Sequence, residues 1–201
     1  MTLDESAGNA ASRRRMSRLL ALFRSIAFYM RSRPQDPCDS AMHLAGRLSA
    51  IGRAALSPVA GGMDLESLIL DEFLAQGVRR APVLVQGPDV RLSAKSAELM
   101  SLVIHELTTN AIKFGALSQS QARLRVIWWF TGPESPRLHL EWSEDGVEMA
   151  AATSRLAGFG TRVVKRLISR ELHGSGDMLF LTEGVLCVIE IPSGEALLQY
   201  D

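Results

Sequence analysis

The sequence has few cysteines, no net charge and no long apolar run, and each of these absences excludes a class of protein. Its two cysteines, Cys38 and Cys187, lie too far apart for a zinc-site spacing and are too few for a disulfide framework. Lys plus Arg and Asp plus Glu both number 22, so the chain lacks the net basic surface of a non-specific nucleic-acid binder. No run of about 18 apolar residues is present to span a membrane, and no signal peptide is evident. These features predict a cytoplasmic protein.

The first 60 residues predict a loose tail and two amphipathic helices. Residues 1–11 are small and polar and form the tail. From about Ser12, apolar residues recur at steps of three and four until a proline-containing break at 31–37. A second helix, capped by Asp39 or Ser40, repeats this apolar stripe. The cluster of arginines in the first helix is interpreted as a solvated helix face, with a nucleic-acid arm as the alternative.

These two helices predict a dimerisation domain over residues 12–60. A single hairpin cannot bury both apolar stripes, so a second hairpin is the natural partner, which gives a four-helix bundle in a dimer. The alternative is that both helices pack on the remainder of the chain. That remainder, residues 61–201, forms the second predicted domain.

Residues 61–201 have the mixed pattern of an α+β fold. Helices are predicted from Asp64 to about Gln76, from Ser93 to about Phe114, and from about Phe159 to Leu172. The strand predictions are 83–85, 90–92, 123–130, 137–142, 176–181 and 185–191. Helices covering one face of a mixed sheet would make an α/β sandwich.

The predicted helix 93–114 presents polar residues in a pattern suited to a magnesium–nucleotide complex. Its buried stripe is Met100, Val103, Ile104, Leu107 and Ala111. Glu106, Asn110 and Lys113 are four and three residues apart, so they share a different face. Hard oxygen ligands suit magnesium, and a lysine suits phosphate. The alternative is an ordinary solvated helix face.

Two further segments carry weaker signals of the same kind. Residues 158–161, Gly-Phe-Gly-Thr, open a helix whose free N–H groups can face an anion; the alternative is a plain helix entry. Residues 142–146, Trp-Ser-Glu-Asp-Gly, stand at a strand end, where the carboxylate of Glu144 can accept from an adenine amine and Gly146 allows a base to lie close. The alternative here is a simple acidic turn.

Taken together and in this order, the segments resemble the HWE class of bacterial sensor histidine kinases. Residues 105–118 are similar to the N box of that class, 142–146 to its Trp-x-Glu-x-Gly segment, and 158–161 to its second glycine box. The resemblance extends from about Arg14 to Pro192 and includes the region from His43 to Gln76.

The resemblance implies a Bergerat-type ATP-binding domain, of the histidine kinase and gyrase type, behind a two-helix dimerisation and phosphotransfer domain. By position, Asn110 would chelate Mg²⁺, Glu106 would order the metal shell or a water, and Lys113 would meet phosphate. Glu144 and Gly146 would bind the adenine, and Gly158, Gly160 and Thr161 would form the mobile lid and meet the phosphates. His105 and Trp142 are signature residues of the class, and His105 joins Glu106 as a candidate catalytic residue.

The phosphoacceptor of the class is missing from its expected position. The alignment of the first helix places Arg14 where the histidine should stand, and a guanidinium stays protonated and cannot accept the phosphoryl group. His43, on the second helix, is the first histidine of the chain. We interpret His43 as a residue that lies at the helix surface or is partly packed. The alternative is that His43 serves as the phosphoacceptor in place of the missing histidine.

Three functions follow from these patterns. The first is a histidine kinase that binds Mg-ATP and phosphorylates a histidine of a partner, in a homodimer or a heterodimer. The second is a pseudokinase, an ATP-gated scaffold for a response regulator. The third is a serine kinase of the anti-sigma-factor type, which the paired dimer helices disfavour. An upstream sensor protein would supply the input, and a response regulator would receive the output.

Overall fold

The computed structural model describes residues 13, 16–17, 19–20, 23–24, 37–56, 62–78, 83–132, 134–148 and 159–200. The chain divides into two compact units, 1–45 and 46–201. The described residues between 13 and 24 are helical, in agreement with the predicted first helix. The tail, Arg14 and Gly158 lie outside the described residues. The predicted hairpin, its dimer and the domain division at residue 60 stay predictions.

The second predicted helix, α2, extends from Pro37 to Leu56 and contains residues of both units. It begins before the predicted caps, Asp39 and Ser40, because proline has the φ angle of a helix and lacks only an N–H that the first turn leaves unbonded. Its apolar stripe is buried at Ile51 and Ala55.

A five-stranded mixed sheet forms the centre of the unit 46–201, with the strand order β2-β4-β5-β7-β6. Its strands are β2 (Val83–Gln86), β4 (Arg123–Thr131), β5 (Arg137–Asp145), β6 (Ser175–Leu181) and β7 (Gly184–Pro192). Strand β2 is parallel to β4, and the other pairs are antiparallel. A smaller sheet has the order β1-β3-β8, with β1 (Met63–Asp64), β3 (Val90–Leu92) and β8 (Leu197–Tyr200).

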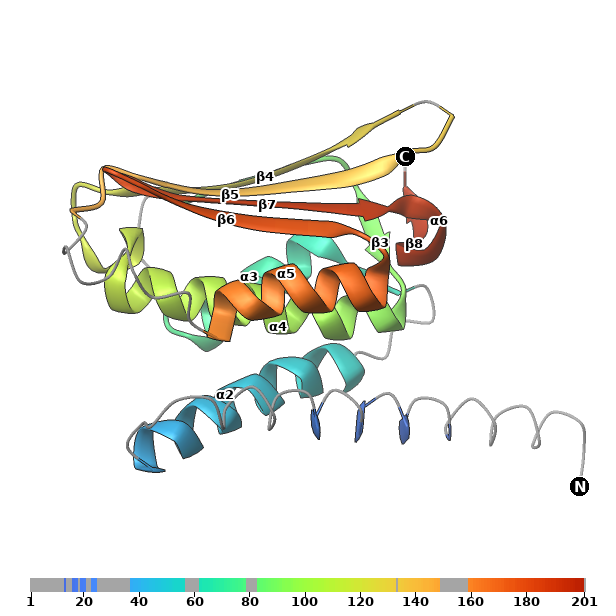
Figure 1. Ribbon diagram of the computed structural model, residues 1–201, viewed down its shortest axis with the longest axis horizontal. Coiled ribbons are helices and arrows are strands. Elements are labelled where there is room, and N and C mark those ends of the chain that lie inside the picture. Colours follow the sequence, from blue (N-terminus) through green and yellow to red (C-terminus); the bar gives the residue numbers. More distant parts are fainter. Residues whose placement is uncertain are drawn as a thin grey trace, which may run out of the picture. The chain divides into compact units, whose positions relative to one another are not determined.

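Three helices cover one face of the five-stranded sheet (Figure 1). They are α3 (Leu65–Ala75), α4 (Ala94–Phe114) and α5 (Phe159–Leu172). The short helices η1 (Ala116–Ser118) and α6 (Ser193–Ala196) follow α4 and β7. The mixed α+β fold with helices on one face is therefore confirmed.

The helix starts follow from side-chain caps. The Asp64 carboxylate accepts from the N–H of Ser67 at 2.8 Å, and the Ser93 hydroxyl accepts from the N–H of Ser96 at 3.2 Å. Each cap satisfies an N–H group that the first helical turn leaves without a partner. The starts of α3 and α4 are thus as predicted.

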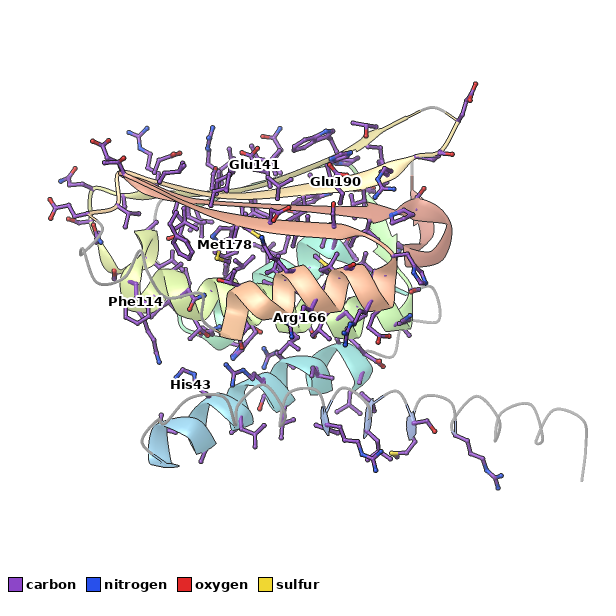
Figure 2. The ribbon with its side chains drawn as sticks, viewed as in Figure 1. His43, Phe114, Glu141, Arg166, Met178 and Glu190 are labelled. Carbon is purple, nitrogen blue, oxygen red and sulfur yellow. The ribbon has the colours of Figure 1, made fainter. Side chains whose placement is uncertain are left out.

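The core lies between the sheet and its helices. Alternate residues of β4 and β5 point toward the helices, and Trp128 and Trp142 are both buried there. Figure 2 shows Met178 on this inner side, whereas Glu141 and Glu190 lie on the outer face of the sheet. Helix α4 is buried along most of its length, including the whole predicted stripe. None of the helices among the described residues is both long and apolar enough to cross a membrane.

Candidate nucleotide-binding site

The segments singled out in the sequence converge at one end of the unit 46–201. The C-terminal end of α4, the N-terminal end of α5 and the C-terminal end of β5 lie at this end (Figure 1). The contact between α4 and β5 is direct, because the Ala116 N–H, just past α4, donates to the carboxylate of Glu144 at 2.7 Å. The fold therefore brings together the N-box helix and the Trp-x-Glu segment, which are separated by about 25 residues of chain.

Asn110 and Lys113 lie where α4 emerges from the core. Asn110 is partly exposed and Lys113 is exposed, whereas the preceding turns of the helix are buried. Phe114, the last residue of α4, is also exposed (Figure 2). An amide oxygen and an ammonium group are thus accessible at this end of the helix, as a magnesium–phosphate ligand would require.

Glu106 is buried and fully engaged by an arginine of α2. Glu106 is 5% exposed. Arg47 donates to both of its carboxylate oxygens, from Nε at 2.6 Å and from a terminal nitrogen at 3.2 Å. Arg47 is itself buried. The interpretation of this helix face as merely solvated is therefore wrong at Glu106. A two-point pair between a guanidinium and a carboxylate is among the strongest polar contacts in proteins.

His105 belongs to a second buried polar cluster, which joins α4 to α3. Its Nδ1 donates to Glu72 at 2.8 Å, and the amide of Gln76 donates to the same carboxylate oxygen at 2.6 Å. Arg53 of α2 forms an ion pair with the other oxygen of Glu72. A Cβ on Gly46 would lie 2.9 Å from the His105 ring, so α2 packs closely against the imidazole. These contacts support a structural role for His105.

The charges around Glu72 overcome its burial. Burial opposes ionisation, but the hydrogen bonds from His105 and Gln76 and the charges of His105 and Arg53 outweigh it, so the pKa of Glu72 is below its usual value. The carboxylate is therefore the stable form at neutral pH, and it holds three donors in place.

Glu144 is buried at the end of β5 and accepts two hydrogen bonds from the protein. Trp142 Nε1 donates to one oxygen at 2.9 Å, and the Ala116 N–H donates to the other. Burial raises the pKa of Glu144, and these two hydrogen bonds offset only part of that effect. A carboxylate has roughly four acceptor positions, so two protein donors leave room for a further N–H donor.

Three other predicted site residues lie among the described residues. Gly146 follows Glu144 with φ 72°, a left-handed conformation that favours glycine. Thr161, in the first turn of α5, is partly exposed and donates from its hydroxyl to the sulfur of Met178 at 3.5 Å. Gly160 lies in the same helical turn.

Little in the sequence indicated which contacts α2 and α3 make with this site. Arg47 lies within the region of the HWE resemblance, but its spacing does not identify a partner. Glu72 lies in the last turns of α3, and Gln76, four residues later, caps the C-terminal end of that helix. That spacing is the one indication that they act together.

The side chains at this site fit a magnesium–nucleotide complex in part. Asn110 and Lys113 are accessible and have the chemistry for metal and phosphate. Glu144 has free acceptor capacity for an adenine amine, although it is 3% exposed in this conformation. Glu106 also keeps unused acceptor positions, but it is 5% exposed and covered by Arg47, so the pair would have to shift before Glu106 could act on a metal-bound water.

Sequence comparison relates the chain to blue-light-activated histidine kinases. It is 34% identical over 167 residues to the one from Rhizobium johnstonii, which covers 81% of this chain and 47% of that protein. It is 28% identical over 192 residues to blue-light-activated histidine kinase 1 of Erythrobacter litoralis, with 91% and 52% covered. The chain thus spans about half the length of these curated relatives. No family model matches it.

Structural comparison agrees in fold. The blue-light-activated histidine kinase EL346 of Erythrobacter litoralis superposes with a TM-score of 0.59 at 18% identity, and the match covers 87% of this chain and 59% of that one. Its separate histidine kinase domain gives a TM-score of 0.55 at 16% identity, covering 89% and 96%. The sequence relatives and this shared fold support a histidine kinase family for the chain.

Proposed function

We propose that this chain is a histidine kinase of the HWE class that binds Mg-ATP and transfers the γ-phosphate to a histidine of a partner protein in two-component signalling. The observation that carries the proposal is the meeting of two segments at one end of the unit 46–201. There the accessible Asn110 and Lys113 end the N-box helix, and the carboxylate of Glu144 is bonded to the residue that follows this helix.

Each residue has a role that its chemistry allows. Asn110 would hold Mg²⁺ through its amide oxygen, and Lys113 would neutralise phosphate. Glu144 would accept from the adenine amine, held in position by Trp142 and the Ala116 N–H. When bound, the magnesium ion offsets charge on the transferred phosphoryl group. The first turn of α5, with Gly160 and Thr161, would supply N–H groups to the phosphates, joined by Gly158.

The phosphate acceptor would lie on another chain. The acceptor position of the class is Arg14, whose guanidinium is permanently protonated and cannot be phosphorylated in this way. The predicted helical hairpin would pair with a second hairpin, from the same or a related kinase, and present that chain's histidine to this ATP site. An upstream sensor and a response regulator would complete the pathway.

Transfer of label from γ-labelled ATP tests the proposal. The chain is incubated with Mg²⁺ and with a related, histidine-bearing kinase whose own N-box asparagine is replaced by alanine. We expect acid-labile label on the partner, and we expect Asn110→Ala to abolish it by removing the metal ligand. Lys95→Ala, at a partly exposed residue at the opposite end of α4, is the control and should leave transfer intact.

Two other outcomes would favour a different function or exclude the proposed one. Tight ATP binding without transfer to any partner would favour the pseudokinase scaffold over the kinase. If the chain bound no ATP at all, both functions would be excluded.

Restoring the missing acceptor is a second test of the assignment. Arg14→His should allow the chain to label itself with γ-labelled ATP, because a neutral imidazole then stands at the acceptor position. Arg13→His, one position away on the same helix, is the matched control and should stay unlabelled. Equal labelling of both variants would show that the alignment of the first helix is wrong.

A further inference from the structure

We propose that Arg47 competes with the magnesium–nucleotide complex for Glu106, so that the pair seen here is an autoinhibitory contact. The inference rests on the proposed function and adds a means of regulation to it. The pair joins α2 to the N-box helix, and it occupies the one carboxylate of that helix that shares a face with Asn110 and Lys113.

The pair covers Glu106 in this conformation. Both carboxylate oxygens are engaged, and the side chains of Arg47 and Glu106 are each 7% exposed. One turn later, Asn110 is partly exposed, and Lys113 is exposed. The metal- and phosphate-binding end of the helix is therefore accessible in the same conformation in which Glu106 is covered.

Competition of this kind lowers apparent affinity. If Mg-ATP draws Glu106 into the water shell of the metal, the Arg47 pair must first separate. The apparent affinity is then reduced by the fraction of molecules in which Glu106 is released. Conversely, a signal that moves Arg47 away from Glu106 raises the released fraction and strengthens Mg-ATP binding, at most by the factor by which the pair had weakened it.

The position of Arg47 gives a route for regulation. It lies on α2, two residues beyond the boundary of the first compact unit, and α2 continues into that unit. The first unit contains most of the predicted dimerisation hairpin. A signal that rotates or shifts α2 would therefore act directly on the Arg47–Glu106 pair.

Arg47→Lys tests the inference with little change in charge. Lysine keeps a positive charge beside Glu106 but loses the planar fork that holds both oxygens. We expect Mg-ATP to bind this variant about fivefold to tenfold more tightly than the wild type, and ATP in EDTA to bind both equally, because the effect acts through the metal. Titration with a fluorescent ATP analogue measures each affinity.

Two controls separate competition from a general loosening of the fold. Arg53→Lys makes the same change on the same helix at a residue paired with Glu72, and it should leave Mg-ATP affinity unchanged. In a Glu106→Gln background, Arg47→Lys should have no further effect, because the contested carboxylate is gone. Arg47→Gln, checked for folding by circular dichroism, should change Mg-ATP affinity in the same direction as Arg47→Lys.

The outcomes distinguish this inference from the proposed function. Wild-type protein that binds Mg-ATP, with folded Arg47→Lys binding it equally or less tightly, would overturn the autoinhibitory contact alone. It would make Arg47 a residue that positions Glu106. Wild-type protein that fails to bind Mg-ATP would overturn the proposed function and this inference with it.

Discussion

Replacement of Gly115 by alanine is expected to weaken the fold and the nucleotide site together. A Cβ at this position would lie 1.9 Å from Oε2 of Glu144 and 2.9 Å from the Cα of Ala111. Gly115 has φ −119° and ψ −152°, an extended conformation open to any residue, so the conflict is one of space alone. The helix backbone has little room to give, and the buried carboxylate must therefore move.

Movement of Glu144 breaks its hydrogen bond from the Ala116 N–H and leaves buried polar groups without partners. We expect the free energy of unfolding to fall by about 3 kcal/mol. ATP affinity should fall by more than tenfold, because the proposed acceptor for the adenine amine is displaced. Urea unfolding followed by tryptophan fluorescence, and titration with a fluorescent ATP analogue, measure the two effects.

Gly52→Ala is the matched control for Gly115→Ala. Gly52 lies within α2, and a Cβ there meets nothing within 4 Å. Alanine in a helix should stabilise the protein by about 0.5–1 kcal/mol and leave ATP binding unchanged. A Gly115→Ala protein as stable as the wild type would contradict the close approach of Glu144 to the end of α4.

Periodicity predicted the main elements of the fold because each is determined by local sequence. The buried stripe and serine cap of α4, and the alternation in β4 and β5, appear in the structure as expected. Strands β1 and β8 were not predicted. They are short and are stabilised by pairing with β3, and β8 pairs with it across more than 100 residues of chain.

The site was predictable in part for the same reason. The spacing of Glu106, Asn110 and Lys113 follows from the helical repeat, and the structure places Asn110 and Lys113 at the accessible end of α4. The partner of Glu106 could not be predicted, because it is 59 residues away on another helix. Local spacing contains no information about such a contact, and the pair rules out the alternative that Glu106 lies on a solvated helix face.

The same limit applies to His105. The sequence offered it as a candidate catalytic residue, whereas its ring is buried against α2 and hydrogen-bonded to Glu72 of α3. A histidine held in this way is suited to joining helices. The stability contributed by this cluster can therefore be tested at Glu72, away from the proposed nucleotide ligands.

Glu72→Gln is expected to destabilise the protein by about 3 kcal/mol at pH 7. The carboxylate accepts from His105 and Gln76 and forms an ion pair with Arg53, and it is 3% exposed. An amide has one acceptor oxygen, and its NH2 group would face one of the three donors, so at least one of these contacts is lost inside the cluster. Glu171→Gln, at a largely exposed residue in an ion pair with the partly exposed Lys95, is the control and should cost less than about 0.5 kcal/mol.

The effect of Glu72→Gln should depend on pH in a defined direction. Because the pKa of Glu72 is lowered in the folded state, the folded protein binds this proton less tightly than the unfolded chain does. The ionised carboxylate therefore stabilises the wild type above the ordinary value of 4.5, and this contribution is lost as the pH falls through the lowered pKa. Urea unfolding from about pH 5 to about pH 3 should show a difference between wild type and Glu72→Gln that shrinks as the pH falls. A difference that stayed constant to pH 3 would show that packing, and not charge, makes Glu72 important.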